Sequence, residues 1–170
     1  AARCGRIDIL VNNAASLGPD IAQNDGDVEH MDTALWDRTY AVNVRGTMIA
    51  SRAALPHLTA SGGNIVNVAS VAGLEGEVYS AGYCAAKHAL VGLTRALAVE
   101  YTREKVRINA VCPGGMLTPQ VTDFTAPDKA DYRLIMRIAA PRGLMQPSDV
   151  ASVIAFLASD DAAAVHGAVY

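Results

Sequence analysis

The stretch Asn64-Ile-Val-Asn-Val-Ala-Ser70 decides the fold of this chain. It is a short apolar run, rich in β-branched residues, that begins directly after the helix-stop signal Ser61-Gly62-Gly63. Near-continuous apolar character is typical of a parallel strand that is covered on both faces. Residues 71–82 form a glycine-rich loop that leads into a helical pattern at about 81–103. We therefore expect a buried parallel strand, then a loop, then a helix.

The segments on either side repeat this order of strand and helix. Apolar runs at 7–12 and 106–112 predict two further strands. Helical periodicity covers residues 36–58, with a break near Asn43 and Gly46, and a last helix opens at Pro147. Residues 166–170 could begin another strand. The alternation predicts an α/β fold in which residues 1–170 form a single domain with a parallel sheet between two layers of helices.

The segment 116–146 has no clear periodicity. It contains prolines at positions 119, 127 and 141 and an amphipathic patch at 132–138. A mobile lid and a plain surface excursion are both consistent with this composition.

Composition excludes several function classes. The net charge is −3, and the arginines are scattered, which argues against a nucleic-acid partner or an anionic membrane surface. No apolar stretch is long enough for a membrane span. The three cysteines and four histidines lack the spacing of metal ligands, so we expect no metal site and infer a reducing cytoplasm.

Tyr83 and Lys87 lie one helical turn apart, with Ser70 thirteen residues upstream of the tyrosine. A free tyrosine has a pKa of about 10, and a nearby ammonium favours its phenolate form. Residues four apart share a helix face, so both side chains can address one substrate. Such pairs are usually solvated, but a serine at the end of a buried strand favours function here. The arrangement indicates a carbonyl–alcohol redox site.

Five blocks of the sequence, in this order, carry a family resemblance. They are Asn12-Asn13-Ala14-Ala15, Asn43, Ser70, Tyr83-x-x-x-Lys87 and Pro113-Gly114-x-x-x-Thr118. Together with the closing segment 147–160, they resemble the short-chain dehydrogenase/reductase family over nearly the whole chain. The resemblance implies a Rossmann-like domain, a nicotinamide cofactor (NAD or NADP), a small secondary alcohol or carbonyl substrate, and a homodimer or homotetramer.

The resemblance also implies roles for individual residues. Tyr83 would be the acid–base group, and Lys87 would lower its pKa and hold the nicotinamide ribose. Ser70 would orient the substrate oxygen, and Asn43 would anchor a water that links Lys87 to solvent. The cofactor pocket would further use Asn12, Ala14, Pro113, Gly114, Met116 and Thr118. Apolar residues at 74, 78, 79, 116 and 117, together with the segment 119–141, would shape the substrate pocket.

Two departures from the family pattern affect these expectations. Ala15 replaces a usual glycine. Against the pattern, the chain also lacks the first βαβ half with its glycine-rich turn, and the closing strand. We therefore expect a partial Rossmann-like sheet with an unprotected edge at 7–12, and hypothesise that these residues alone fold poorly and bind no dinucleotide. A non-catalytic binding or scaffold module, and an epimerase or dehydratase of the wider family, remain as alternatives.

Overall fold

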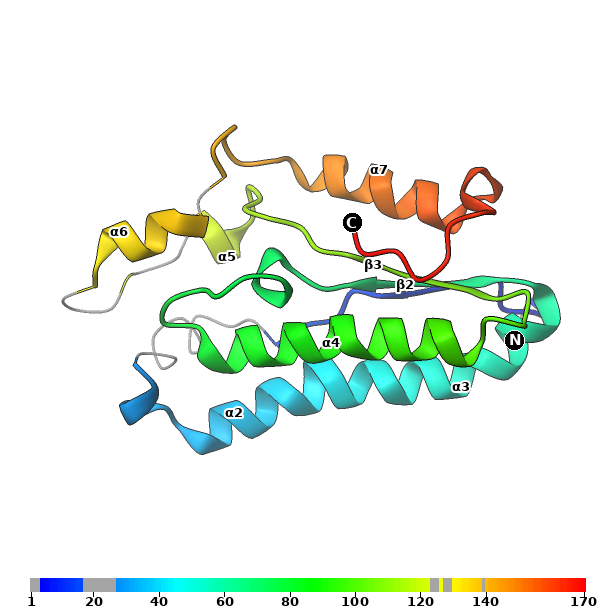
Figure 1. Ribbon diagram of the computed structural model, residues 1–170, viewed down its shortest axis with the longest axis horizontal. Helices are drawn as coiled ribbons and strands as arrows, with labels where there is room; N and C mark the ends of the chain where they lie inside the picture. The colour runs from blue at the N-terminus through cyan, green and yellow to red at the C-terminus, as the bar shows by residue number, and fades with distance from the viewer. Residues whose placement is uncertain (1–3, 17–26, 123–125, 127–129, 139) are drawn as a thin grey trace.

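A computed structural model describes residues 4–16, 27–122, 126, 130–138 and 140–170 (Figure 1). Three strands form one parallel sheet in the order β1 (Ile9–Asn12), β2 (Asn64–Val68) and β3 (Arg107–Val111). Val66 of β2 is paired with Val11 on one side and with Asn109 on the other. The parallel sheet and all three predicted strands are thus confirmed.

Helices cover both faces of the sheet (Figure 1). On one face lie α2 (Thr33–Tyr40), the π-helical turn η2 (Ala41–Gly46), α3 (Thr47–Ser61) and α4 (Ala81–Glu100), and on the other lies α7 (Pro147–Ala158). The short elements are η1 (Val28–His30), η3 (Val71–Gly73), α5 (Pro119–Thr122), α6 (Tyr132–Ile135), η4 (Met136–Ile138) and η5 (Asp160–Ala162). The three-layer α/β/α architecture is therefore confirmed.

An apolar core fills the space between the sheet and the helices on each face, because successive strand residues point to opposite faces. Ile65 packs with Leu58 of α3 and Ile108 of β3 in the core beneath α3 and α4. Its neighbour Val66 packs instead with Val111, and with Leu157 of α7, in the core on the other face. The apolar run of β2 is continuous because side chains on both of its faces are buried.

The predicted helix over 36–58 is interrupted where the sequence indicated. Residues 41–46 form a π-helical turn, and Asn43 is buried within it. The Thr47 hydroxyl donates to the Asn43 carbonyl oxygen at 3.1 Å, which supports the wider turn. Gly62, with φ 68°, ends α3 in the left-handed conformation that glycine adopts at low cost.

The two edges of the sheet differ. Beside β3, the amide of Cys112 donates to the Tyr170 carbonyl at 2.6 Å and the amide of Tyr170 to the Ala110 carbonyl at 3.0 Å. Residues 168–170 thus lie beside β3 through an isolated parallel bridge between Val169 and Ala110, at the place where the sequence indicated a further strand. On β1, by contrast, the side chains of Ile9 and Val11 are 48% and 40% exposed. This is the apolar edge expected from the sequence.

Buried asparagines connect the strands to the surrounding elements. Asn64 of β2 donates to the Ala158 carbonyl at the end of α7, at 3.0 Å. Asn67 donates to the Thr94 hydroxyl of α4 at 2.9 Å. Asn109 of β3 donates to the Val165 carbonyl at 2.9 Å. These bonds pair the three amide donors, whose burial would otherwise be costly, whereas the buried Asn64 Oδ1 has no partner among the described residues.

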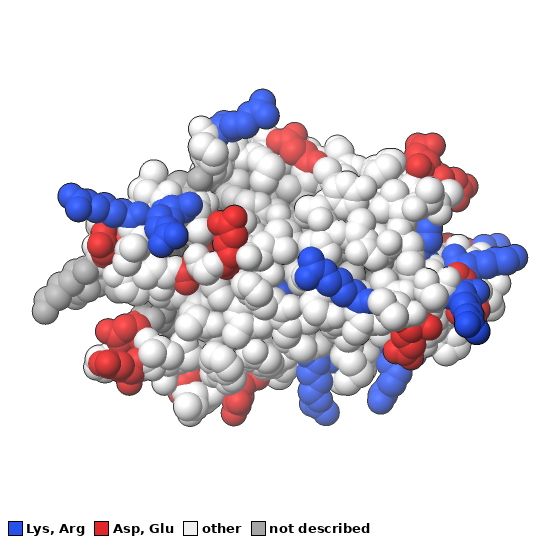
Figure 2. Space-filling model, in the orientation of Figure 1, with Lys and Arg blue, Asp and Glu red and all other residues white. Residues whose placement is uncertain are grey.

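Charged side chains of both signs are scattered over the face shown in Figure 2, without a large patch of one sign. Among the described helices, none has the length and apolar character needed to cross a membrane. Within the same described residues, no three or more His, Cys, Asp or Glu side chains come together as a metal-binding group.

Candidate active site

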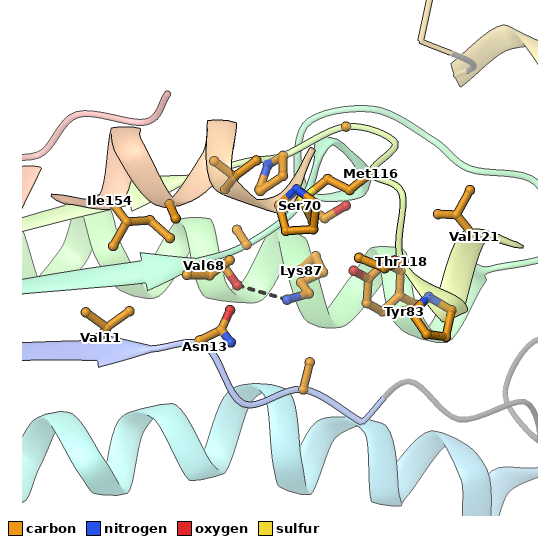
Figure 3. Close-up of a pocket in the computed structure, with 18 residues that line it drawn as sticks. Val11, Asn13, Val68, Ser70, Tyr83, Lys87, Met116, Thr118, Val121 and Ile154 are labelled. Atoms are coloured by element: carbon orange, nitrogen blue, oxygen red, sulfur yellow. Dashed lines mark hydrogen bonds between the residues drawn. The ribbon is translucent and has the colours of Figure 1, made fainter. Parts of the chain in front are cut away.

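A cavity of about 700 Å³ opens at the carboxyl ends of the strands (Figure 3). Such edges are where ligands bind in open α/β sheets, because the loops that follow the strands converge there. The lining comes from the carboxyl ends of β1 and β2 and the residues that follow them, from α4, the loop after β3, α5 and α7. Its residues are Val11, Asn13, Ala15, Val68, Ala69, Ser70, Tyr83, Lys87, Pro113, Gly114, Met116, Thr118, Pro119, Val121, Pro147, Val150, Ala151 and Ile154.

Tyr83 and Lys87 share the buried face of α4 at this cavity. Their side chains are 9% and 3% exposed, and the Lys87 Nζ lies 5.5 Å from the centre of the Tyr83 ring. The Lys87 ammonium donates to the Val68 carbonyl oxygen at 2.9 Å, which ties α4 to the end of β2 (Figure 3). The expected pairing of the two side chains on one helix face is present.

Burial changes the acidity of Lys87. Its pKa is lowered from 10.5 to about 8 because burial disfavours the charged ammonium, and the nearby Cys112 thiol opposes part of this effect. A lysine with a pKa of about 8 exchanges protons readily near neutral pH.

Ser70 lies where β2 ends and η3 begins. Its hydroxyl oxygen accepts a hydrogen bond from the Ala72 amide at 3.2 Å, which fixes the side chain as the N-cap of η3. The hydroxyl hydrogen is left to be donated, since the oxygen is the acceptor in this bond. Next to it, the Val71 amide donates to the Pro113 carbonyl at 2.9 Å, so the two loops at the cavity are joined directly.

The loop after β3 contributes the other predicted residues. Pro113, Gly114, Met116 and Thr118 all line the cavity. The loop is held by a parallel bridge between Met116 and Met145, in which the Met145 amide donates to the Gly115 carbonyl at 3.0 Å. Sequence reasoning missed the lining residues of α7. The proline that opens this helix marked its start but gave no sign that the helix lines the cavity.

Asn12, Ala14 and Asn43 are not among the lining residues. The Asn12 side chain turns into the protein, where it donates to the Asn67 amide oxygen at 2.8 Å. Asn13 and Ala15 line the cavity instead. The Asn43 amide oxygen accepts from the Ser16 amide at 2.8 Å, whereas its buried Nδ2 has no partner in the described part of the chain.

Of the residues expected to shape a substrate pocket, Met116 lines the cavity, as do Pro119 and Val121 of the segment 119–141. Leu74, Val78, Tyr79 and Leu117 lie outside the lining. Tyr79 has φ 59°, the left-handed region that a bulky residue seldom adopts. Its hydroxyl accepts a hydrogen bond from the Asp131 amide at 3.0 Å, at the start of α6. Tyr79 therefore connects the loop before α4 to the segment that follows β3.

Cys84 and Cys112 are both partly buried, and Cys112 packs against the cluster of Ala69, Leu90 and Val91. Burial raises the pKa of the Cys112 thiol, although the Ser70 amide and the Lys87 charge oppose the shift. Its surroundings are thus those of a small apolar packing residue.

The chain is similar to known dehydrogenases. It is 44% identical over 168 residues to meso-2,3-butanediol dehydrogenase of Serratia marcescens, covering 99% of this chain and 63% of that protein. It is also 44% identical over 172 residues to 2-(S)-hydroxypropyl-CoM dehydrogenase 3 of Xanthobacter autotrophicus, covering 98% of this chain and 64% of the relative. The chain thus spans just under two thirds of the length of these relatives.

Solved structures show the same similarity in three dimensions. A tyrosine-to-phenylalanine variant of ElxO with NADPH bound matches 99% of this chain and 66% of its own, with a TM-score of 0.82 and 32% identity. 4-Hydroxyisoleucine dehydrogenase complexed with NADH matches 96% and 66%, with a TM-score of 0.77 and 30% identity. The sequence model of the family described as enoyl-(acyl carrier protein) reductase matches residues 1–170. The chain belongs to the short-chain dehydrogenase/reductase family.

Proposed function

We propose that this chain carries the acid–base site of an NAD(P)-dependent oxidoreductase that interconverts a secondary alcohol and a carbonyl. The observation that carries the proposal is the convergence of Tyr83, Lys87 and Ser70 on one cavity at the carboxyl ends of the strands. Relatives whose names describe alcohol dehydrogenases, and structural neighbours with NADPH or NADH bound, support the same reaction class.

Tyr83 is the group that exchanges a proton with the substrate oxygen. Its hydroxyl gives the proton when a carbonyl is reduced and takes it when an alcohol is oxidised. The Lys87 ammonium, near the tyrosine ring, favours the phenolate during this exchange. Ser70 donates its free hydroxyl hydrogen to the substrate oxygen and so holds that oxygen for the transfer.

The residues present fit a nicotinamide nucleotide. The cavity lies at the sheet edge that binds such ligands, and Lys87 uses one donor on Val68 and has further N–H groups for ribose hydroxyls. The cofactor supplies the hydride donor or acceptor. Pro113, Gly114, Met116 and Thr118 would hold the nicotinamide end. Asn12 and Ala14 would serve the adenosine side only through their backbone, next to the lining residues Asn13 and Ala15, because the Asn12 side chain bonds to Asn67.

Asn43 is proposed to anchor a water that relays the proton between Lys87 and solvent. Its Nδ2 is a buried donor without a protein partner among the described residues, which favours a bound water because an unpaired buried donor is costly. The π-helical turn that contains Asn43 supports this role, since such turns are frequent at functional sites.

The test uses the full-length gene product that contains these residues. It is assayed with NAD and NADP and a panel of secondary alcohols and ketones, from the absorbance of the reduced nicotinamide. Tyr83→Phe should lower kcat by about 10²–10⁴-fold, because it removes the proton donor and leaves the ring in place. Tyr101→Phe, at the far end of α4, is the matched control and should stay within about twofold of the unaltered enzyme.

Full activity in Tyr83→Phe would refute the mechanism. Nucleotide binding without turnover on the whole panel would favour the non-catalytic alternative. The choice between NAD and NADP is made by the same assay.

We also propose that the protein is a cytoplasmic homo-oligomer and that residues 1–170 form a single domain. A dimer or tetramer through η2, α3 and α4 is supported by the exposed apolar side chains of Val42, Met48, Ile49 and Val99. Light scattering of the full-length protein tests the oligomer. A monomer at micromolar concentration would contradict it.

A further inference from the structure

Gly73 packs its backbone directly against the backbone of Lys87. A Cβ at Gly73 would lie 2.7 Å from the Lys87 carbonyl oxygen and 2.9 Å from its carbonyl carbon. Those atoms belong to the α4 backbone, which cannot rotate away as a flexible side chain can. Gly73 is not among the residues with positive φ, so the close approach, and not the backbone angle, requires a glycine here.

This contact joins the two elements that carry the proposed catalytic groups. Ser70 and Gly73 are the two ends of one tight turn, because the Gly73 amide donates to the Ser70 carbonyl at 2.8 Å and the Ser70 hydroxyl caps η3. Lys87 lies on α4 and donates to the Val68 carbonyl just before that turn. A displacement of Gly73 away from α4 would therefore carry Ser70 with it and alter the packing around Lys87.

We infer that Gly73 is a positioning residue that sets, through its contact with the Lys87 backbone, the placement of Ser70 relative to the Tyr83–Lys87 pair. The inference rests on the proposed function for its catalytic consequence. Gly73 is absent from the cavity lining, so it acts only through Ser70 and Lys87.

The first experiment measures steady-state kinetics of Gly73→Ala in the full-length gene product. Misplacement of Ser70 should lower kcat by about tenfold or more, with a smaller change in KM. Two other glycines give matched controls. Gly76→Ala, in the same loop, and Gly92→Ala, on α4, place a Cβ where nothing lies within 4 Å, so both should keep kcat within about twofold.

A double-mutant cycle distinguishes positioning from a general loss of packing. If Gly73 acts partly by placing the Ser70 hydroxyl, Gly73→Ala should lower kcat by less in a Ser70→Ala background than in the unaltered protein, and the effect that remains comes through Lys87. Fully additive effects of the two substitutions would contradict the inference.

A second readout does not need turnover. Lys87 is one of three lysines in this sequence, with Lys105 and Lys129. Reductive ¹³C-methylation and NMR titration can follow it, with Lys87→Arg to assign the signal. The lysine should titrate with a pKa near 8 in the unaltered protein and closer to 10.5 in Gly73→Ala, because the displaced turn admits water.

The outcomes separate the inference from the proposed function. A Gly73→Ala variant with unchanged kcat, with an unchanged Lys87 titration, or unable to fold would overturn the positioning role. Absence of turnover in the unaltered protein would defeat the proposed function, and the Lys87 titration would still decide whether the Gly73 contact controls the environment of the lysine.

Discussion

The α4 side of the cavity (residues 69–73 and 82–90) is largely buried and bonded into the sheet, whereas the Pro113 side (residues 113–118 and 144–147) is largely half-buried or exposed. On the α4 side, Lys87 bonds to β2 and the Gly73 turn packs against the Lys87 backbone. On the Pro113 side, the Met116–Met145 bridge holds one loop segment to another. The α4 side is thus bonded into the sheet, and the Pro113 side meets it through the hydrogen bond between the Val71 amide and the Pro113 carbonyl.

The largest effect on kcat is expected from removing the Lys87 charge on the α4 side. Lys87→Met keeps the length of the side chain but removes the ammonium next to Tyr83, so kcat should fall by about 10²–10⁴-fold. Lys105→Met, at an exposed position, is the control and should stay within about twofold. A Lys87→Met enzyme that retained most of its kcat would place the acid–base chemistry elsewhere.

The burial of Lys87 should also make stability depend on pH. Below about pH 8 the lysine is protonated in both the folded and unfolded states, and the buried charge destabilises the fold. Between pKa values of about 8 folded and 10.5 unfolded, the unfolded state binds more protons, so stability rises with pH. Each pH unit is worth about 1.4 kcal/mol, or about 3 kcal/mol over this window.

Urea unfolding of the unaltered protein and of Lys87→Met at a series of pH values measures this effect. The unfolding free energy of the unaltered protein, relative to the variant, should increase by that amount from neutral to alkaline pH. If the difference in unfolding free energy between the two proteins did not change with pH, folding would not lower the pKa of Lys87.

Asn67 supports the α4 side from within the sheet, between Asn12 and Thr94. Asn67→Ala leaves buried polar partners unsatisfied and should lower the unfolding free energy by about 2 kcal/mol. On the Pro113 side, Thr118→Val should cost less than about 0.5 kcal/mol. Denaturant unfolding of the two variants measures both losses of unfolding free energy. Equal losses would show that the α4 side is no more firmly held than the Pro113 side.

The smallest effect is expected where the Pro113 side is tied to the loop before α4. Tyr79→Phe removes the hydroxyl that accepts from the Asp131 amide, an exposed hydrogen bond worth about 0.5–1.5 kcal/mol. Substrate KM should change by no more than about tenfold, and kcat should stay within about twofold, because Tyr83 and Ser70 keep their places. A large fall in kcat would show that the Pro113 side also positions the chemistry.

Local patterns were sufficient to predict the strands, the helices on both faces and the Ser70–Tyr83–Lys87 group. The i, i+4 spacing places Tyr83 and Lys87 on one face whatever the rest of the chain does. Ser70 follows a strand that composition alone identifies as buried.

Other features depend on contacts between distant residues, which no local pattern contains. Whether Asn12 or Asn13 faces the cavity depends on the register of β1 in the sheet. A shift of one residue would turn each side chain to the opposite face. The Met116–Met145 bridge joins positions far apart in the chain. The break near Asn43 was predictable, but its π-helical geometry was not, because one extra residue in a turn leaves no compositional sign.

The asparagines of β2 and β3 have a consequence for folding. Strands as apolar as these two could slide past one another and still bury their valines and isoleucines, so hydrophobicity alone discriminates poorly among alignments. Asn64, Asn67 and Asn109 reach α7, α4 and the Val165 carbonyl, respectively, in the native alignment. A slide of one residue would bury these amides among apolar side chains without partners. The three amides thus stabilise the native strand alignment relative to shifted ones.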